Sequence, residues 1–464
     1  MEFTFKQLLP SLSQASMTAD VQVTGLSTDS RKIKAGDVFV ALRGEQFDAH
    51  DFLPQITSTG AVAVIAERVP ADFPLPAILV PDSRLALAEV GRFWRQQFSL
   101  PVIGVTGSNG KTTVKEMIAS ILATGFGESH RLSTKGNLNN EIGVPLTVME
   151  LRATHQAAVI EMGMNHPGEI ALLAFVACPT VALVNNAQRE HQEFMQTVRA
   201  VAEENGTAIK ALPDNGTAVF PYGDEYSELW RSYATEQGQR RVIRFGLSAQ
   251  AEVAGTYVAS VFGSDITMSI AGNTSLIRLQ AAGEHNVLNA LAAAACCHAI
   301  GIADDVIVRG LEHFHPVSGR LQRKQAVCGA TLIDDTYNAN PDSVRAAIDV
   351  LKQVGGDTIL VLGDMGEVGE SGAEFHHEIG AYAQASGLSS LYLLGDQVRH
   401  SATGYGERAA YFNDITSLLS ALDDRVTGES TVLVKGSRFM KMERVVHHLL
   451  GAENSLQQKT IGSH

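Results

Sequence analysis

The sequence is poor in cysteine and aromatic residues and has no long apolar run. Its four cysteines, at positions 178, 296, 297 and 328, form no CxxC pair. This spacing argues against a zinc site or a disulfide framework, so we expect reduced thiols in the core. No apolar run reaches the ~18 residues of a membrane helix, and the N-terminus lacks the basic and apolar regions of a secretory signal. These absences predict a cytoplasmic protein without a membrane span.

An excess of positive charge is absent as well. The chain carries 36 Lys and Arg against 50 Asp and Glu, which gives a formal net charge of −14 at pH 7. Nucleic-acid backbones are bound by clustered basic side chains, so this composition disfavours a nucleic-acid partner. We expect the protein to act as a monomer.

Glycine and small aliphatic residues are abundant instead. The 464 residues include 42 glycines, and 45% are hydrophobic while only 6% are aromatic, which favours an α/β fold. Domains average roughly 150 residues, so the length suggests about three. We place them at residues 1–98, 99–318 and 319–464.

The three regions differ in their patterns. The first holds short strand-like runs between turns, as in a small α/β domain. In the second, apolar strand patterns alternate with helical ones, which implies a parallel sheet covered by helices. The third resumes this alternation after "HPVSGR" and is typical of a doubly wound, Rossmann-like sheet, with ligands expected at the carboxyl ends of its strands.

The segment "TGSNGKTT" follows the apolar strand "PVIGV" and precedes a helical pattern. Gly107 and Gly110 allow backbone N–H groups to converge on an anion at the positive end of the following helix. Lys111 supplies a mobile charge for terminal phosphates, and Thr112 can give its hydroxyl to Mg²⁺. A strict P-loop needs glycine where Val105 stands, so an ordinary glycine-rich turn is the alternative. The candidate phosphate-binding residues are Gly107, Ser108, Asn109, Gly110, Lys111, Thr112 and Thr113.

Two residues at strand ends are candidate metal ligands beside this loop. Glu161 ends the strand "AAVIE", and His191 follows the strand "TVALV". A carboxylate at the carboxyl end of a strand near a phosphate loop is well placed to hold a metal. On the residues alone, a structural glutamate and a capping or surface histidine stay open as alternatives.

Seven motifs in a fixed order resemble the Mur ligases, the ATP-dependent ligases of peptidoglycan synthesis. They are "TGSNGKTT", "KGNLNNEIGVPLT", "AVIEMGMNHPGEI", "GEHNVLNALAA", "SGRLQ", "DDTYNANPDS" and "VLVKGSR". The resemblance runs from about Val21 to Val446. Within the family the chain is most similar to the branch that adds D-alanyl-D-alanine to UDP-N-acetylmuramoyl-tripeptide. Relatives that add diaminopimelate or lysine carry "DNPR" where this chain reads "TYNANPDS".

The resemblance implies a UDP-precursor-binding domain, a central ATPase and a C-terminal Rossmann-like domain that closes over the site. ATP would phosphorylate the precursor carboxylate to an acyl phosphate, which the amine of the dipeptide would attack. ATP and Mg²⁺ are the implied cofactors, and cell-wall biogenesis, cell shape and cell division are the implied processes. By resemblance, the catalytic residues are Lys111, Glu161, His191 and Arg320, and the metal-site residues include Thr112, Glu161 and His191.

Further roles follow from the resemblance. Asn286 and Asn289, three residues apart on one helix, suit recognition of an adenine edge, with helix capping as the alternative. Arg320 would reach the nucleotide from a hinge, and Asp335 would bind its ribose unless it only caps a strand end. For the precursor-binding set, generic loop polarity is the competing interpretation. That set is Ser27, Ser30, Arg31, Arg43, His50, Asn140 and Glu141, and the residues expected near the incoming amine are Asn338 and Asn340.

The chain departs from the family pattern at Asn205. Many members carry a carbamylated lysine fourteen residues after the histidine, where it bridges a second magnesium ion, and asparagine cannot be carbamylated. Glu203 and Glu204 stand beside this position, and Mg²⁺ prefers carboxylate oxygens. We predict that Glu204 replaces the lysine, directly or through water, with a solvated helix face as the alternative.

Other functions stay open on the sequence. A second enzyme class is another amide-forming Mur-type ligase, such as the amino-acid-adding or folate-polyglutamate branch. A third class is a P-loop kinase, a switch NTPase or a non-catalytic nucleotide-binding regulator.

Overall fold

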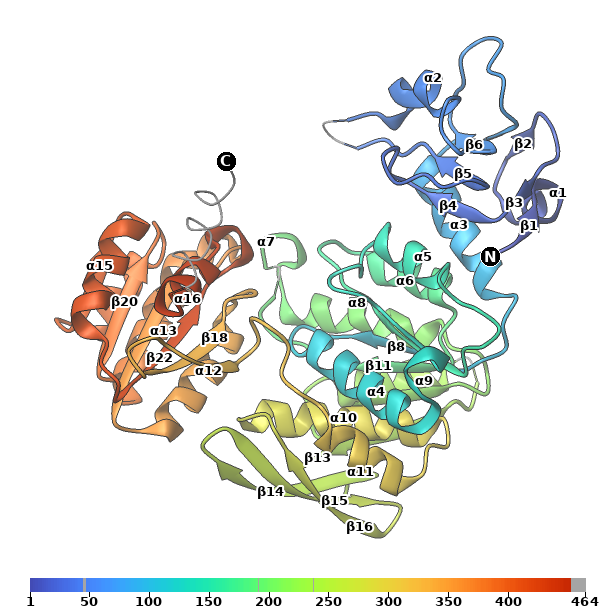
Figure 1. Cartoon of the computed structure of the whole chain (residues 1–464). Helices are drawn as coiled ribbons and strands as arrows, with labels where there is room; N and C mark the ends of the chain where they lie inside the picture. The colour runs from blue at the N-terminus through green and yellow to red at the C-terminus, as the bar shows by residue number, and fades with distance from the viewer. Residues whose placement is uncertain (45–46, 191, 237, 452–464) are drawn as a thin grey trace.

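The computed structural model describes residues 1–44, 47–190, 192–236 and 238–451. Figure 1 shows three bodies, with the first, in blue, and the last, in orange and red, on different sides of the middle one. We call residues 1–98, 99–318 and 319–451 the N-terminal, central and C-terminal domains, and these boundaries stay predictions. The α/β class predicted from the sequence is confirmed. In the described ranges, no helix is both long and apolar enough to cross a membrane.

The N-terminal domain is built on a small sheet with the order β2-β7-β6-β5-β4, parallel except where β2 joins β7. A separate antiparallel pair, β1 and β3, packs beside it. The long helix α3 starts at Asp82, whose carboxylate accepts the N–H groups of Arg84 and Leu85 as an N-cap. The elements are β1 Phe3–Thr4, α1 Phe5–Leu8, β2 Ser16–Met17, β3 Gln22–Val23, β4 Gly25–Ser27, β5 Asp37–Val40, α2 Leu53–Ile56, β6 Ala63–Ala66, β7 Ala77–Leu79 and α3 Ser83–Arg95.

The central domain holds a nine-stranded sheet with the order β16-β15-β14-β13-β12-β11-β8-β10-β9. The seven neighbouring strands β14, β13, β12, β11, β8, β10 and β9 run parallel, as predicted. At the other edge, β15 and β16 extend the sheet from β14 with antiparallel pairing, which the strand–helix alternation did not predict. Its strands are β8 Val102–Thr106, β9 Arg131–Ser133, β10 Ala157–Glu161, β11 Val181–Val184, β12 Thr217–Pro221, β13 Arg241–Gly246, β14 Val253–Ser260, β15 Gly263–Ile270 and β16 Asn273–Leu279. Its helices are α4 Lys111–Phe126, α5 Gly143–Val148, α6 Glu169–Ala177, α7 Gln192–Met195, α8 Val198–Lys210, α9 Ser227–Thr235, α10 Glu284–Ala299 and α11 Asp304–Glu312.

The C-terminal domain has a six-stranded sheet with the order β17-β18-β22-β19-β20-β21, antiparallel only between β17 and β18. Neighbouring residues Leu332 and Ile333 belong to different core clusters, so both faces of the sheet are covered. The elements are β17 Gln322–Gln325, β18 Thr331–Asp335, α12 Pro341–Val354, β19 Asp357–Gly363, α13 Gly372–Ala385, β20 Ser390–Leu394, α14 Arg399–Tyr405, β21 Ala409–Phe412, α15 Ile415–Arg425, β22 Ser430–Lys435 and α16 Glu443–Leu449.

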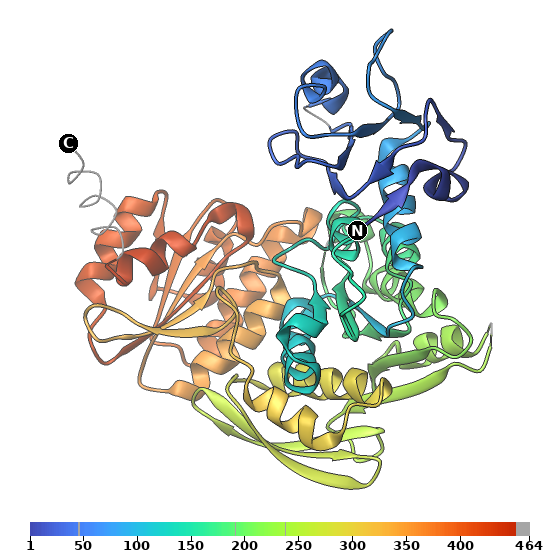
Figure 2. The same ribbon diagram turned by 45° about the vertical axis from the view of Figure 1, so that its right-hand side comes forward.

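Helix α3 joins the N-terminal domain to the central one. Figure 2 shows it leading from the first body toward the middle one, and it packs on α5 and α6. One apolar cluster runs through this contact, from Leu87 and Trp94 of α3 to Val144 and Ala174 of the central helices. The two domains therefore share a continuous core.

Candidate active site

The loop between β8 and α4 has the backbone of an anion-binding turn. Gly107 and Gly110 have φ of +131° and +81°, in the region that favours glycine, and Gly110 is the N-cap of α4. A Cβ on Gly110 would lie 2.4 Å from the Oδ1 atom of Asn289, so there is no room for a larger residue. The N-terminus of a helix of this length, reached through such a loop, favours negative charge.

Lys111 folds back over the loop. Its Nζ donates to the carbonyl oxygens of Gly107 (2.5 Å) and Ser108 (3.0 Å) and lies 3.2 Å from Oε1 of Glu190. Both side chains of this ion pair are largely buried, with 15% and 12% of their surface exposed. Lys111, the lysine of the predicted loop motif, thus lies at the loop and already contacts an anionic oxygen.

Thr112 and Glu161 meet beside Lys111, as predicted. The Thr112 hydroxyl donates to Oε1 of Glu161 (3.1 Å), and the same oxygen accepts from Nδ2 of Asn139 (2.8 Å). Glu161 is 2% exposed, and its Oε2 atom has no hydrogen-bond partner among the described residues. A buried carboxylate oxygen without a partner is unusual, and with a neighbouring hydroxyl it fits a hard cation.

The described residues include no group of three or more His, Cys, Asp and Glu side chains placed to hold a metal. Mg²⁺ is commonly bound by one or two carboxylates together with substrate phosphates and water, so a small donor set does not conflict with it. The predicted ligand His191 lies outside the described residues, and its role stays a prediction.

Arg320 and Asp335 approach the loop from the C-terminal domain. The Nη2 atom of Arg320 donates to the Thr112 hydroxyl (2.8 Å), and its guanidinium lies 4.1 Å from the ring centroid of Tyr337. Asp335 is held by Nζ of Lys435 (2.6 Å), and burial raises the pKa of its carboxyl although Lys435 opposes the shift. Arg320 therefore reaches the loop, and its contact with the nucleotide stays a prediction, while Asp335 is engaged in a buried ion pair.

A set of neutral amides fixes the shape of the loop. The Asn109 N–H donates to Oδ1 of Asn186 (2.8 Å), and Nδ2 of Asn185 donates both to the Asn109 carbonyl (2.8 Å) and to Asn289 (2.9 Å). Asn289 in turn donates to Asn286 (3.2 Å). The two asparagines predicted to bind adenine thus support the loop through Asn185, and both also border the cavity described below.

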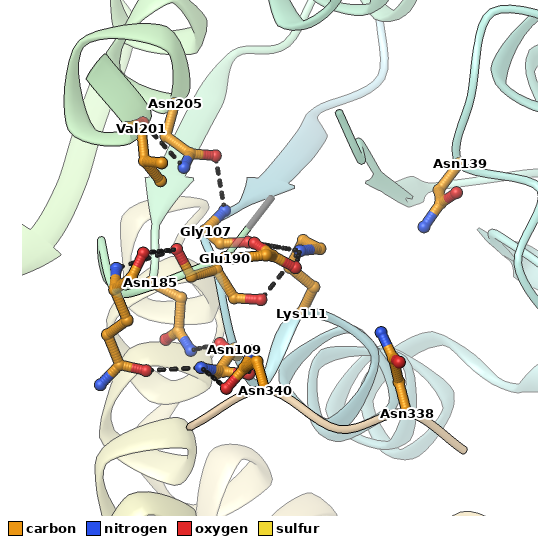
Figure 3. Close-up of polar contacts among 12 residues, drawn as sticks. Gly107, Asn109, Lys111, Asn139, Asn185, Glu190, Val201, Asn205, Asn338 and Asn340 are labelled. Atoms are coloured by element: carbon orange, nitrogen blue, oxygen red, sulfur yellow. Dashed lines mark hydrogen bonds and ion pairs between the residues drawn. The ribbon is translucent and has the colours of Figure 1, made fainter. Parts of the chain in front are cut away.

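Asn205 belongs to the same support. Its Oδ1 accepts the N–H of Gly107 (2.9 Å) and its Nδ2 donates to the Val201 carbonyl of its own helix (3.0 Å), as Figure 3 shows. Glu203 pairs with Arg199 on the outer face of α8, at 2.9 Å. Glu204 caps helix α6, because its Oε1 accepts the N–H of Ile170 (2.9 Å). The metal role predicted for Glu204 thus has no geometric support, since this oxygen is engaged elsewhere and Glu204 does not line the cavity.

A cavity of about 900 Å³ opens over the loop and takes residues from all three domains. The N-terminal domain contributes Arg84, the central domain Asn140 and Glu141, and the C-terminal domain Asn338 and Asn340. Arg84 lies 3.7 Å from Glu141 and donates to the Arg43 carbonyl at 3.2 Å. The cavity thus brings together the predicted peptide-side and amine-side residues.

Figure 3 shows how the two C-terminal asparagines differ. Asn340 is the N-cap of α12 and its amide pairs with that of Asn109, donating at 2.9 Å. Asn338 accepts from the Ala339 N–H (2.9 Å) and has no dashed contact to the loop in this view. Asn340 therefore ties the C-terminal domain to the phosphate loop.

The predicted precursor-binding residues of the N-terminal domain lie apart from this cavity. His50 is buried, with Nδ1 2.6 Å from Asp48 and Nε2 accepting the Glu67 N–H, so both ring nitrogens are used within the domain. Ser27 donates to the Asp29 carbonyl, and Arg31 pairs with the Asp29 carboxylate. None of the predicted set in this domain, Ser27, Ser30, Arg31, Arg43 and His50, lines the cavity in the described part of the chain.

Several residues of the site were missed from the sequence. Arg84, Asn139, Glu190 and Lys435 each contact a predicted site residue or border the cavity, and Arg189 binds Asp342, which also borders it. Three of them carried a sequence signal, since Glu190 precedes the candidate His191, Asn139 lies in the motif "KGNLNNEIGVPLT" and Lys435 lies in the motif "VLVKGSR".

Comparisons with known proteins find similarity along nearly the whole chain. Residues 22–92 match the family model described as Mur ligase family, catalytic domain, residues 105–297 the Mur ligase middle domain, and residues 319–438 the Mur ligase, glutamate ligase domain. The UDP-N-acetylmuramoyl-tripeptide–D-alanyl-D-alanine ligase of Escherichia coli strain K12 is 38% identical over 452 residues, covering 96% of this chain and 98% of that relative.

Two solved structures of the enzyme named MurF are similar in fold. The structure from Acinetobacter baumannii matches with a TM-score of 0.91 at 34% identity, covering 97% of this chain and 99% of that one. The structure from Thermotoga maritima, in complex with ADP, matches with a TM-score of 0.83 at 28% identity, covering 92% of this chain and 97% of that one.

Proposed function

This chain belongs to the Mur ligase family, and we infer from that premise that it joins D-alanyl-D-alanine to UDP-N-acetylmuramoyl-tripeptide at the expense of ATP. The reaction forms an amide bond and contributes to the synthesis of peptidoglycan precursors in the cytoplasm. The observation that carries the proposal is the cavity of about 900 Å³, in which residues of three domains surround one phosphate loop. Two substrates and a nucleotide need such a shared chamber.

In this proposal the loop binds the phosphates of ATP. Lys111 exchanges its contact with Glu190 for the terminal phosphates, and the Gly110 N-cap directs the positive end of α4 at them. Arg320, bonded to Thr112, adds a second positive charge where the γ-phosphate meets the precursor carboxylate. Two anionic groups must approach each other in this step, so fixed cations lower the barrier.

Thr112 and Glu161 would hold Mg²⁺, with His191 as a further predicted ligand. Two observations support this assignment: Oε2 of Glu161 has no hydrogen-bond partner among the described residues, and Oε1 of the same carboxylate accepts from the Thr112 hydroxyl. The ion would supply a Lewis acid that spreads the charge of the transferring phosphoryl group. Asn139 orients the Glu161 carboxylate by donating to its other oxygen.

The remaining residues would place the two organic substrates. We propose that Asn140, Glu141 and Arg84 face the peptide of the precursor, and that the exposed Arg43 contacts its uridine end, while His50 maintains the domain's own structure. Asn338 and Asn340 border the cavity from the C-terminal domain and would face the dipeptide amine that attacks the acyl phosphate. Phosphate then leaves the tetrahedral intermediate, and the loop cations receive it.

An acceptor-dependence assay tests the proposal. ADP release is measured with the UDP-tripeptide alone, with D-alanyl-D-alanine alone, with both, and with the tripeptide plus lysine, diaminopimelate or glutamate. We expect turnover only when the tripeptide and the dipeptide are both present. Turnover with a single amino acid would indicate another ligase branch, and turnover without an acceptor would indicate a kinase or switch NTPase.

A further inference from the structure

The segment that follows β11, residues 185–190, lies between the phosphate loop and the C-terminal domain. On its loop side, the Asn186 carbonyl accepts the Ser108 N–H (3.1 Å) and the Asn186 side chain accepts the Asn109 N–H (2.8 Å). Its last residue, Glu190, is the anionic partner of Lys111. The position of this segment therefore sets both the loop backbone and the loop lysine.

On its other side, the segment reaches the C-terminal domain through Arg189. The guanidinium donates to Asp342 through Nη2 (2.6 Å) and to Glu378 through Nη1 (2.8 Å), and the Arg189 N–H also donates to Asp342 (3.0 Å). It lies 5.2 Å from the ring centroid of Phe375, and Arg345 donates to the same Glu378. The Arg189 guanidinium holds the pKa of the Glu378 carboxyl below its usual range.

The two carboxylates belong to different helices of one domain. Asp342 lies in the first turn of α12, two residues after the N-cap Asn340 that pairs with Asn109, and Glu378 lies in α13. The N-terminus of α12 is thus fixed at two points, one on the loop and one on the segment behind it. The Arg189 and Asp342 side chains have about a quarter of their surface exposed, so solvent screens their charge–charge attraction only in part. The bidentate geometry also fixes the orientation of the two groups.

We propose that Arg189 is a positioning residue for ligation: by binding Asp342 and Glu378, it seats segment 185–190 so that Asn186 and Glu190 hold the phosphate loop and Lys111 in place. Docking of the domain that offers Asn338 and Asn340 to the dipeptide is thereby coupled to the geometry of the nucleotide site. The kinetic part of this inference rests on the proposed function, but the structural part does not.

Hydrogen exchange of the Ser108 and Asn109 amides tests whether Arg189 seats the segment, because both amides donate to Asn186. The variant is Arg189→Ala, and the control is Arg425→Ala, which removes an arginine of similar exposure bound to Asp357 inside the C-terminal domain. We expect exchange of the loop amides to rise about tenfold in Arg189→Ala, as for the loss of one partner of a charged hydrogen-bonded pair, and to stay unchanged in the control. Equal exchange in the two variants would overturn the proposal.

Ligation kinetics test the coupling. Arg189→Ala should raise the KM for D-alanyl-D-alanine about tenfold and lower kcat, and Arg189→Lys, which keeps the charge but not the two-carboxylate fork, should fall between it and wild type. The double variant Arg189→Ala, Asp342→Asn should have the same KM and kcat as Arg189→Ala alone, because both substitutions remove the same Arg189–Asp342 contact. Additive losses, or wild-type kinetics in Arg189→Ala, would contradict the coupling. If wild type does not ligate the dipeptide, the proposed function fails, and the exchange result still decides whether Arg189 seats the loop.

Discussion

The central domain meets its two neighbours through interfaces of different chemistry. Toward the N-terminal domain, α3 buries Leu87 and Trp94 in a core cluster that continues into the central helices. Toward the C-terminal domain, the main contacts are polar, from Arg320 to Thr112, from Asn340 to Asn109 and from Arg189 to Asp342 and Glu378, with Phe262 as an apolar addition.

This difference predicts that the apolar interface persists whatever is bound and that the polar interface responds to ligands. Apolar burial stabilises a contact in proportion to its area, regardless of what binds nearby. Polar contacts exchange readily with water or with a ligand's own groups, so their net strength is small and their geometry is decisive. The polar interface is also the one that surrounds the phosphate loop, where charge changes during the reaction.

The largest effect is expected at the phosphate loop, whose neighbours Asn109 and Thr112 make contacts of the polar interface. Lys111→Ala should lower kcat by ~10²–10³ or more, because the charge that meets the phosphates is lost. Thermal unfolding should stay close to wild type, since Lys111 faces the loop and not the apolar core. Turnover near that of wild type, measured by ADP release, would refute the loop assignment.

The apolar interface should respond in the opposite way. Trp94→Ala removes a side chain that is 8% exposed and whose indole N–H donates to the Leu151 carbonyl, so we expect a loss of about 3–5 kcal/mol in the free energy of unfolding. Urea denaturation measures it, with ligation assayed at low temperature as the control for function. Urea denaturation of Arg189→Ala provides the comparison. If Trp94→Ala loses no more unfolding free energy than Arg189→Ala does, the two interfaces do not differ as described.

The sequence predicted the parts of this comparison that depend on local pattern. The glycines of the phosphate loop, the helix at Lys111 and the strand end at Glu161 follow from short segments, and the parallel central sheet follows from alternating strands and helices. The antiparallel hairpins from β14 to β16 lack such alternation and were not predicted.

The interfaces themselves could not be predicted, because their partners are distant in sequence. Arg189 and Asp342 stand 153 positions apart, and Gly107 and Asn205 stand 98 apart. No periodicity reports such a pairing. Local charge was a poor guide at Asn205. The neighbouring carboxylate of Glu204 suggested a metal ligand, whereas the buried Asn205 accepts the Gly107 N–H and Glu204 caps α6.

A smaller effect is expected from the support behind the loop. Asn205→Ala leaves the buried Gly107 N–H without its acceptor, which should weaken ATP binding about tenfold. Titration with a fluorescent ATP analogue measures this change, and Glu203→Gln, on the outer face of the same helix, is the matched control. Unchanged binding in Asn205→Ala would refute the supporting role.

The same helix makes a prediction about bicarbonate. Asn205 cannot be carbamylated, and Nζ of Lys210 lies 3.7 Å from the ring centroid of Tyr233, where neither residue lines the cavity. Bicarbonate should therefore not stimulate the wild type, and Glu204→Gln should keep the Mg²⁺ dependence of wild type because an amide oxygen can still cap α6. Stimulation by bicarbonate would point to a lysine such as Lys210 at the site.

The smallest effect concerns pH at the polar interface. His285, at the start of α10, has its pKa lowered to about 4 by burial, with Lys435 adding to the shift. The unfolded chain takes up this proton below its ordinary pKa of about 6.5, so the neutral folded form loses stability as pH falls from there toward 4. His285→Gln should flatten this part of the curve of unfolding free energy against pH. An identical decline in both proteins would exclude His285 as a cause.

If the loop activates a carboxylate for attack by the dipeptide amine, one oxygen of that carboxylate leaves with the phosphate, and isotope labelling detects this transfer. The UDP-tripeptide is labelled with ¹⁸O in its terminal carboxylate and incubated with ATP, Mg²⁺ and D-alanyl-D-alanine, and the released phosphate is analysed by mass spectrometry. Formation of an acyl phosphate moves one carboxylate oxygen to phosphate, so we predict one ¹⁸O in each phosphate released with product. Unlabelled phosphate would show that ATP is hydrolysed by water and would contradict activation of the carboxylate as an acyl phosphate.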